Sequence, residues 1–296
     1  MAGDARSLQG KVVAITGGGR GIGEATVRAM VRAGAQVAIG EIDLQVGQRV
    51  ADSLGARAEA FELDVTQRAS FAAFLGATEE RFGALDVLVN NAGVMLLGRL
   101  LDESDERARR MIDINVLGVL YGMKEGIPRL LSRPEGHLVN VASSAGKVGA
   151  AGGATYCGTK HFVVGVSEAA RAELRGTGVE VSCVMPAVVN TELASGLASP
   201  KGVKPLAPAD VAAAILAAVQ RPRFDVYVPK ALGPMGAVMG VFPRGAREAL
   251  GRAMGADRLL DDVDESGRSA YERRAAPESA PTSAPAGESA PAGQLA

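Results

Sequence analysis

The sequence predicts an α/β fold with three layers, in which helices cover both faces of a seven-stranded parallel sheet. Short runs rich in β-branched residues alternate with longer helical patterns along the chain, as in proteins built from βαβ units. Several strand candidates are almost entirely apolar, such as residues 12–15 and 87–89. Strands of that kind are covered by helices on both faces, which is typical of parallel sheets.

The predicted strands are separated by segments long enough to hold one helix each. We expect strands at residues 11–16, 36–40, 57–62, 86–90, 137–142, 180–185 and 225–228. The hydrophobic periodicity predicts helices at residues 23–33, 44–54, 68–82, 104–131, 155–175 and 209–220. Pro128 lies inside the fourth helix and is expected to end or kink it, because proline has no backbone N–H.

The sequence pattern changes after residue 230, where the predicted α/β domain (residues 1–230) ends. Residues 231–242 are apolar but interrupted by glycine and proline, and residues 244–254 have the pattern of an amphipathic helix. We therefore expect a helical extension over residues 231–274. Residues 275–296 are rich in Ala, Pro and Ser and are predicted to be disordered, because they cannot bury enough apolar surface.

The composition narrows the class of protein. Apolar residues make up 47% of the chain, and 32 basic residues nearly balance 33 acidic ones, so no electrostatic footprint for nucleic acid is visible. No run approaches the roughly 20 apolar residues that cross a membrane. Two cysteines give no disulfide framework. The absence of such a framework fits a reducing compartment, so we expect a cytoplasmic protein. His137 and His161 do not form a metal-ligand set, so we expect no metal site.

A glycine-rich turn joins the first predicted strand to the first predicted helix, with the sequence Thr-Gly-Gly-Gly-Arg-Gly-Ile-Gly at residues 16–23. Glycines allow the tight turn and let backbone N–H groups approach a pyrophosphate at the helix N-terminus. The position between strand and helix makes this motif more specific than glycines alone. The turn therefore predicts a dinucleotide site, with contacts from Gly17, Gly19, Arg20, Gly21, Ile22 and Gly23.

Glu41 bears on which nicotinamide cofactor is bound. It ends the second predicted strand, eighteen residues after Gly23, where an acid can accept hydrogen bonds from the adenosine ribose and would repel a 2′-phosphate. Arg20 in the glycine-rich turn could instead help to hold that phosphate. We weigh Glu41 more heavily, so NAD is expected and NADP stays possible.

Tyr156 and Lys160 are four residues apart on a predicted helix and so share one face. A free phenol has a pKa near ~10 and is a weak base at neutral pH, but a cation within about 4–6 Å favours the phenolate. With its pKa lowered in this way, Tyr156 could donate or remove a proton at an oxygen that is being reduced or oxidised.

Polar residues at the ends of other strands accompany this pair. The fifth strand leads into Ser143 and Ser144, and the fourth leads into Asn-Asn-Ala-Gly at residues 90–93. Together with the glycine-rich turn, Tyr-x-x-x-Lys and a Pro-Ala-Val-Val-Asn-Thr segment at residues 186–191, these elements resemble the short-chain dehydrogenase/reductase family. The resemblance covers about residues 8–229 and implies a Rossmann-type fold and an NAD(P)-dependent oxidoreductase.

The resemblance also implies roles for individual residues. Tyr156 matches the general acid/base, Lys160 the lysine that holds the nicotinamide ribose, Ser143 the group that binds the substrate oxygen, and Asn115 the asparagine of a proton relay; Ser144 is the weaker candidate beside Ser143. Further cofactor contacts are implied for Asp64, Val65, Asn91, Ala92, Gly93, Val189 and Thr191. One departure is Ala187, which stands where the family usually has glycine; it would be strained there if the position needs a positive φ.

The substrate expected is a lipophilic secondary alcohol or ketone, because the segments around the catalytic edge are apolar: Val94, Met95, Leu96, Leu97, Val148 and Ala151. Two alternatives are a 3-oxoacyl thioester reductase of the same family and a non-catalytic dinucleotide sensor. The helices at residues 104–131 and 155–175 are expected to pair in a homodimer. The extension could cap the substrate cleft, block tetramer formation or rest on a membrane; packing over the cleft is favoured.

Overall fold

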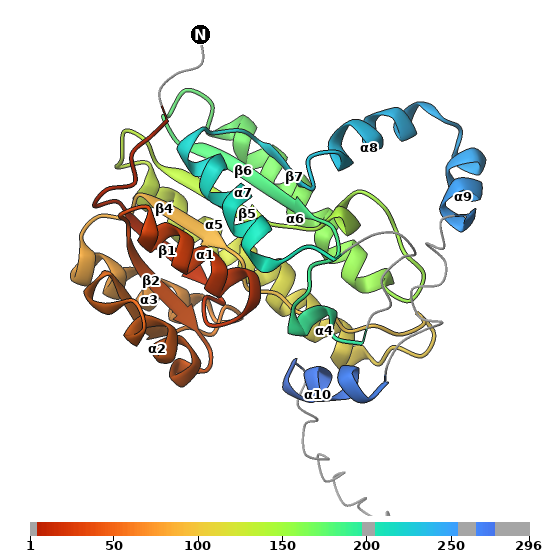
Figure 1. Ribbon diagram of the computed structural model, residues 1–296, viewed down its shortest axis with the longest axis horizontal. Coiled ribbons are helices and arrows are strands. Elements are labelled where there is room, and N and C mark those ends of the chain that lie inside the picture. The colour runs from red at the N-terminus through yellow and green to blue at the C-terminus, as the bar shows by residue number, and fades with distance from the viewer. Residues whose placement is uncertain (1–4, 197–204, 254–264, 276–296) are drawn as a thin grey trace, which may run out of the picture.

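The computed structural model describes residues 5–196, 205–253 and 265–275. Seven parallel strands form one sheet in the order β3-β2-β1-β4-β5-β6-β7 (Figure 1). All seven predicted strands are present, with each boundary within one residue of the prediction. Their bounds are β1 Val12–Thr16, β2 Gln36–Glu41, β3 Ala58–Glu62, β4 Val87–Asn90, β5 His137–Val141, β6 Glu180–Pro186 and β7 Asp225–Val228.

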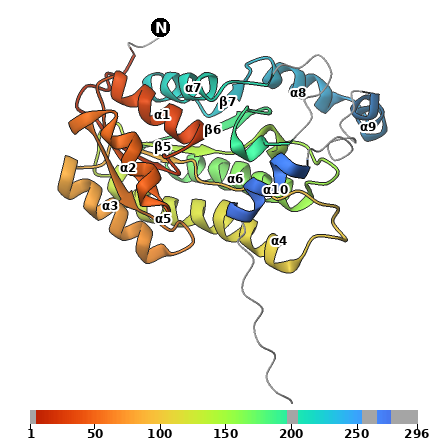
Figure 2. The ribbon, with the colours of Figure 1, turned by 60° about the horizontal axis from the view of Figure 1, so that its bottom comes forward.

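Helices cover both faces of this sheet, which confirms the three-layer fold (Figure 2). The layer that packs in one buried cluster holds α1 Gly21–Arg32, α2 Leu44–Asp52 and α7 Pro208–Gln220. The opposite layer holds α3 Arg68–Phe82, α5 Gly118–Leu130 and α6 Ala154–Glu173. The apolar strand runs are buried because side chains on both faces of each strand meet a helix layer.

The predicted helix at residues 104–131 is wrong as a single α-helix. It consists of α4 Asp105–Ile112, a π-helical turn η2 Asp113–Leu117, and α5. A π turn holds one more residue than an α turn, and such turns occur often at functional sites. Pro128 lies inside α5, two residues before the helix ends at Leu130. The helix tolerates it there, because a proline so near the helix end removes only one hydrogen bond.

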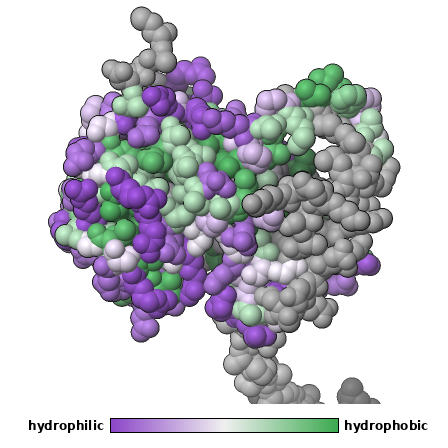
Figure 3. All heavy atoms as spheres, viewed as in Figure 1, coloured by the Kyte–Doolittle hydropathy of each residue, from purple (hydrophilic) through white to green (hydrophobic). Residues whose placement is uncertain are grey.

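The described parts of the extension beyond β7, residues 229–253 and 265–275, are mostly helical despite their glycines and prolines. It contains α8 Leu232–Val241, α9 Arg244–Ala253 and α10 Glu265–Ala275. Pro234 lies in the first turn of α8, where a missing N–H costs little. Apolar side chains gather on α8 and just after it, where Val238, Val241 and Phe242 are exposed (Figure 3). In contrast, α10 returns to the sheet domain and lies beside α4 (Figures 1 and 2).

Two predictions, on membrane-spanning helices and on the disordered tail, can be compared with the described residues alone. Within residues 5–196, 205–253 and 265–275, no helix is long and apolar enough to cross a membrane. The tail predicted to be disordered falls on residues 276–296, outside the described residues, and Ala275, its first predicted member, ends α10.

Candidate active site

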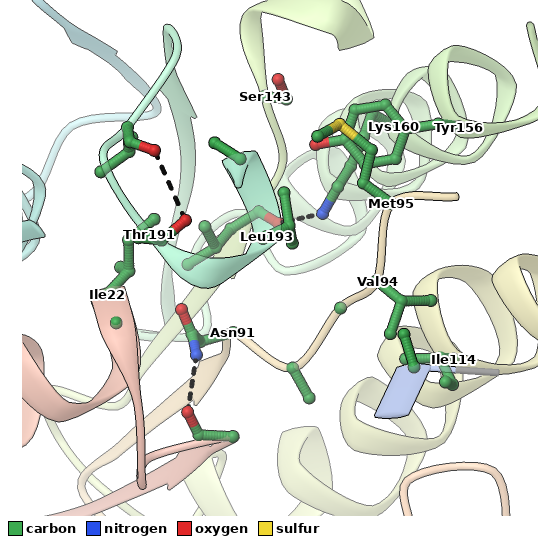
Figure 4. Close-up of a pocket in the computed structure, with 18 of the residues that line it drawn as sticks. Ile22, Asn91, Val94, Met95, Ile114, Ser143, Tyr156, Lys160, Thr191 and Leu193 are labelled. Atoms are coloured by element: carbon green, nitrogen blue, oxygen red, sulfur yellow. Dashed lines mark hydrogen bonds between the residues drawn. The ribbon is translucent and has the colours of Figure 1, made fainter. Parts of the chain in front are cut away.

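A cavity of about 490 Å³ lies at the carboxyl ends of the strands. It spans the point where the strand order reverses, between β1 and β4, and ligands of open α/β sheets bind at such a point. Its lining includes the glycine-rich turn on one side and Tyr156 with Lys160 on the other (Figure 4). The two halves of the site predicted from the sequence therefore face one common space.

The glycine-rich turn has the geometry of a cradle for phosphate. Gly17 and Gly21 have φ angles of +63° and +53°, which residues with a side chain rarely adopt. A Cβ on Gly23 would lie 1.9 Å from the carbonyl oxygen of Gly17, so only glycine fits at the start of α1. The Asn91 side chain fixes the turn from the end of β4, because its Nδ2 donates to the carbonyl oxygens of Thr16 (2.9 Å) and Gly17 (3.2 Å).

Glu41 lies at the end of β2 with its carboxylate turned toward this turn. Its Oε2 accepts a hydrogen bond from the Gly19 N–H at 3.0 Å, and its Oε1 accepts one from Ile42 at 3.1 Å. Burial raises the pKa of Glu41, while these backbone hydrogen bonds and the Arg20 guanidinium oppose the rise. The carboxylate thus lines the cavity at the end of β2, as the sequence predicted.

Tyr156 and Lys160 lie one turn apart on α6 and are buried, with Ser143 at the end of β5 beside them (Figure 4). The Lys160 Nζ lies 5.9 Å from the centroid of the Tyr156 ring and donates a hydrogen bond to the Val141 carbonyl oxygen at 3.0 Å. An ammonium has three N–H donors. Among the described residues, the Val141 carbonyl oxygen is the one acceptor of a hydrogen bond from Lys160 Nζ. Two of its N–H donors are therefore available to the hydroxyls of a ribose.

The expected lowering of the Tyr156 pKa is wrong for the protein in this state. Burial raises the pKa of Tyr156 to about 12, and the Ser143 hydroxyl only partly opposes the rise. Burial also lowers the pKa of Lys160 to about 8. Desolvation is the largest cause of both shifts, because both side chains are buried and burial disfavours the charged form of each. The phenol is therefore protonated at neutral pH.

Asn115 lies in the π turn η2 and is fully buried behind the cavity. Its Oδ1 accepts a hydrogen bond from the Val94 N–H, and its Nδ2 donates to the Val94 carbonyl oxygen, both at 2.8 Å. The same Nδ2 donates to Thr159 Oγ1 at 3.1 Å. The side chain thus connects the segment after β4 to α6, next to Lys160, and does not itself line the cavity.

The loop after β6, which contains Ala187, Val189 and Thr191, has no residue in the left-handed region before Gly196. No residue other than glycine has a positive φ in the described part of the chain, so Ala187 carries no strain and the expected conflict does not arise. Val189 and Thr191 line the cavity from this loop.

Most of the predicted cofactor contacts meet in the same cavity. Apart from Gly19, which faces an adjoining hollow with Arg20 and Gly21, the predicted lining residues are Gly17, Arg20, Gly21, Ile22, Gly23, Glu41, Asp64, Val65, Asn91, Ala92, Gly93, Val189 and Thr191. The free donors of Lys160 and the glycine cradle fit a nicotinamide dinucleotide. In the described residues no group of three or more His, Cys, Asp or Glu is placed to bind a metal.

Helix α10 belongs to the extension that was expected to pack over the substrate cleft, and it does line the cavity, but the sequence predicted none of its individual residues at the site. Tyr271, Arg274 and Ala275 line the cavity, although they lie far along the chain from every motif. The segment is polar overall and has no apolar stripe of the kind that marks a core helix. A tyrosine among charged residues was the one available signal, and alone it carries little information.

Comparisons with known proteins agree with this geometry. The sequence pattern of the family described as "short chain dehydrogenase" matches residues 11–202. The chain is 39% identical over 188 residues to 2,5-dichloro-2,5-cyclohexadiene-1,4-diol dehydrogenase of Sphingobium indicum, covering 63% of this chain and 75% of that protein.

Two solved structures have the same fold. A short chain dehydrogenase/reductase from Burkholderia phymatum in complex with NAD gives a TM-score of 0.73 at 28% identity, covering 79% of this chain and 94% of that one. The 3-ketoacyl-(acyl-carrier-protein) reductase of Brucella melitensis, complexed with NADH, gives 0.69 at 30% identity, covering 75% and 98%. The chain therefore belongs to the short-chain dehydrogenase/reductase family and is an oxidoreductase that acts on CH–OH groups.

Proposed function

We propose that this protein interconverts a secondary alcohol and a ketone with NAD, and that Tyr156 is its general acid/base. The observation that carries the proposal is the meeting of Tyr156, Ser143 and Lys160 in one cavity with the glycine-rich turn. When bound, the nicotinamide supplies the acceptor or donor of the hydride. The protein's own side chains then have to bind the substrate oxygen and move one proton.

Proton transfer to and from the substrate oxygen is the step that this chain's own side chains carry out. In carbonyl reduction, Tyr156 donates its phenolic proton to the substrate oxygen, which becomes a hydroxyl, and Ser143 donates a hydrogen bond to the same oxygen. In alcohol oxidation the phenolate takes that proton back. Since burial raises the pKa of Tyr156 to about 12, the protonated phenol serves reduction directly. Oxidation requires the phenolate, and the positive charge of Lys160, 5.9 Å from the centroid of the Tyr156 ring, stabilises it.

We assign NAD rather than NADP because of Glu41. Its carboxylate occupies the end of β2, hydrogen-bonded to the turn that would hold the phosphates. A phosphate placed there would meet a half-buried negative charge, and two like charges in contact are costly where water is partly excluded. The NAD and NADH complexes of the two structural neighbours support this assignment.

The substrate proposed is lipophilic. Val94, Met95, Leu97, Val148 and Leu193 line the substrate end of the cavity, whereas Leu96 is buried in the adjacent core and Ala151 lies outside the lining. Apolar walls favour substrates that lose little hydration on entering. The relative that acts on a chlorinated cyclohexadiene diol is consistent with a ring alcohol.

Tyr156→Phe tests the proposal. The variant keeps the ring and its packing but has no proton to donate, so turnover of a screened panel of secondary alcohols and ketones should fall by about 10²–10⁴-fold, while NADH binding measured by fluorescence is unchanged. Tyr227→Phe is the matched control, because Tyr227 is a half-buried tyrosine on β7 outside the cavity. Equal loss in both variants, or turnover retained in Tyr156→Phe, would overturn the assignment.

A 3-oxoacyl thioester reductase is a second candidate, and the similarity to the Brucella enzyme supports it. Turnover of an acetoacetyl thioester well above that of ring ketones would favour this alternative. A non-catalytic dinucleotide sensor would bind NADH without turnover of any substrate in the panel.

We further propose a cytoplasmic homodimer that pairs through α5 and α6. Tyr121, Phe162 and Val166 are half-buried apolar side chains on these helices, and a partner would cover them. Light scattering should give twice the mass of the chain; a monomer would refute this pairing, and a tetramer would require a further interface.

A further inference from the structure

Helix α10 joins the two chain segments that form the sides of the substrate end of the cavity. One segment follows β4 and contains Met95 and Leu97, and the other follows β6 and contains Leu193 and Ser195. The helix is contributed by residues 265–275, well beyond the last strand. It completes a site whose other parts all come from the sheet domain.

The joint between these segments is the buried guanidinium of Arg268, whose exposed fraction is 4%. Arg268 donates to the carbonyl oxygens of Met95 and Leu193, the latter at 2.8 Å, and to Ser195 at 3.5 Å. Its Nε donates to Glu272 Oε1 at 3.0 Å. The planar fork of arginine holds five N–H donors in a fixed geometry and so reaches acceptors that lie further apart than those around the compact ammonium of lysine. A buried cation with this many partners holds its surroundings in one arrangement.

A second set of contacts, several of them at the cavity lining, fixes α10 to α4 and to the segment after β6. Glu272 Oε2 pairs with Arg107 at 3.0 Å, and the Arg110 Nε donates to the Ala275 carbonyl oxygen at 3.2 Å. Arg274 pairs with Glu192 at 3.0 Å. Such partly exposed pairs contribute little energy each, so Arg268 remains the main anchor.

Tyr271 is the side chain that this anchor presents to the site. Its hydroxyl oxygen accepts a hydrogen bond from the Met95 N–H at 3.0 Å, and the Arg268 guanidinium lies 5.0 Å from its ring centroid. The ring packs in one buried cluster with Met95, Met111 and Tyr156. Tyr271 and Ala275 therefore form an apolar wall beside the proposed proton donor.

Resting on the function proposed above, we propose that α10 is the wall that limits the size of the substrate. In this proposal Tyr271 and Ala275 are specificity-determining residues, and Arg268 is a positioning residue that acts through them. The ligand class that fits is a compact, apolar ring alcohol or its ketone. A larger ring system would have to displace Tyr271 from a cluster that is already closely packed.

Selectivity within a series of alcohols tests the wall. Cyclohexanol, 2-decalol and a 3-hydroxysteroid present the same reacting group on one, two and four rings. Tyr271→Ala removes the ring and should raise kcat/KM for 2-decalol relative to cyclohexanol at least tenfold. Arg268→Met should raise KM for cyclohexanol several-fold and shift the same ratio, with KM for NAD unchanged. Arg268→Lys, which keeps the charge but not the fork, should lie between Arg268→Met and the wild type.

Arg273→Met is the matched control, because Arg273 is an exposed arginine on the same helix and does not line the cavity. It should leave both kcat/KM values and their ratio unchanged. A general loss of stability would lower turnover of all alcohols alike without changing their ratio. An unchanged ratio in folded Tyr271→Ala and Arg268→Met proteins, as judged by thermal unfolding, would overturn the proposal.

A second readout separates this proposal from the proposed function, because it needs no turnover. The dye 1-anilinonaphthalene-8-sulfonate is a two-ring probe of apolar pockets. It should bind Tyr271→Ala at least fivefold more tightly than it binds the wild type or Arg273→Met. If the wild type oxidised no alcohol but this difference were found, the reaction would be wrong and the wall correct. Equal dye affinity for all three proteins would refute the wall.

Discussion

The buried ammonium of Lys160 leads to a prediction in which stability and activity change in opposite directions. Burial lowers the Lys160 pKa from 10.5 to about 8, which corresponds to about 3 kcal/mol of folding free energy lost when the charged group is buried. Lys160→Met removes this cost together with the hydrogen bond to Val141, which is worth about 1 kcal/mol. At pH 7 the cofactor-free variant should therefore be more stable than the wild type by about 2 kcal/mol.

The dependence on pH follows from the direction of the shift. Because the pKa is lower in the folded state, the cost is fully present below about pH 8 and disappears as the pH rises toward 10.5, where the unfolded chain also loses the proton. The advantage of the variant should therefore shrink between pH 7 and pH 10. Turnover should meanwhile fall by about 10²-fold or more, since the phenolate has lost its nearby cation.

Urea denaturation at pH 7, 9 and 10 measures the free energy of unfolding of both proteins. Lys124→Met, which replaces an exposed lysine on α5, should stay within about 0.5 kcal/mol of the wild type at each pH. A Lys160→Met protein that is less stable than the wild type at pH 7, or that keeps the same advantage at pH 10, would show that the ammonium is not desolvated as described.

Three further predictions concern the cofactor site and the proton. Gly23→Ala would place a Cβ 1.9 Å from the Gly17 oxygen, so NADH affinity by fluorescence should fall at least tenfold and stability by about 1–3 kcal/mol; Gly76→Ala, with open space around it, should stabilise by about 0.5–1 kcal/mol and leave affinity unchanged. Glu41→Ser should raise the ratio of NADP to NAD turnover tenfold, and Glu62→Ser at the neighbouring strand end should not. Since the Tyr156 pKa is raised, the rate of alcohol oxidation should increase from pH 6 to about 8, the range in which Lys160 keeps its proton, and a plateau below pH 7 would contradict this.

The strands and the glycine-rich turn could be predicted from the sequence because their signals are local. A strand between two helix layers is buried on both faces and is therefore mainly apolar, as β1 and β4 are before their last residues. The turn between β1 and α1 needs glycines at fixed positions. The residues that line the cavity followed from these elements, because parallel strands end at one edge of the sheet.

What the sequence could not predict depends on contacts between distant residues. The π turn that holds Asn115 has no distinct periodicity, and the environment of Tyr156 depends on burial that several elements create together. The place of α10 rests on a single buried arginine and its carbonyl partners. Carbonyl acceptors belong to every residue and leave no pattern in a sequence.

The order of synthesis gives the position of α10 a consequence for how the site matures. Strand β7 ends at Val228, whereas α10 runs from Glu265 to Ala275, and a ribosome adding about 5–20 residues per second needs on the order of a few seconds to cover that interval. Until residue 275 has been added, the growing chain lacks the wall that Tyr271 and Ala275 supply, so the cavity cannot be complete on that side. Among the described elements α10 is the last to be synthesised, and the substrate end of the site is therefore the last part of it to be supplied.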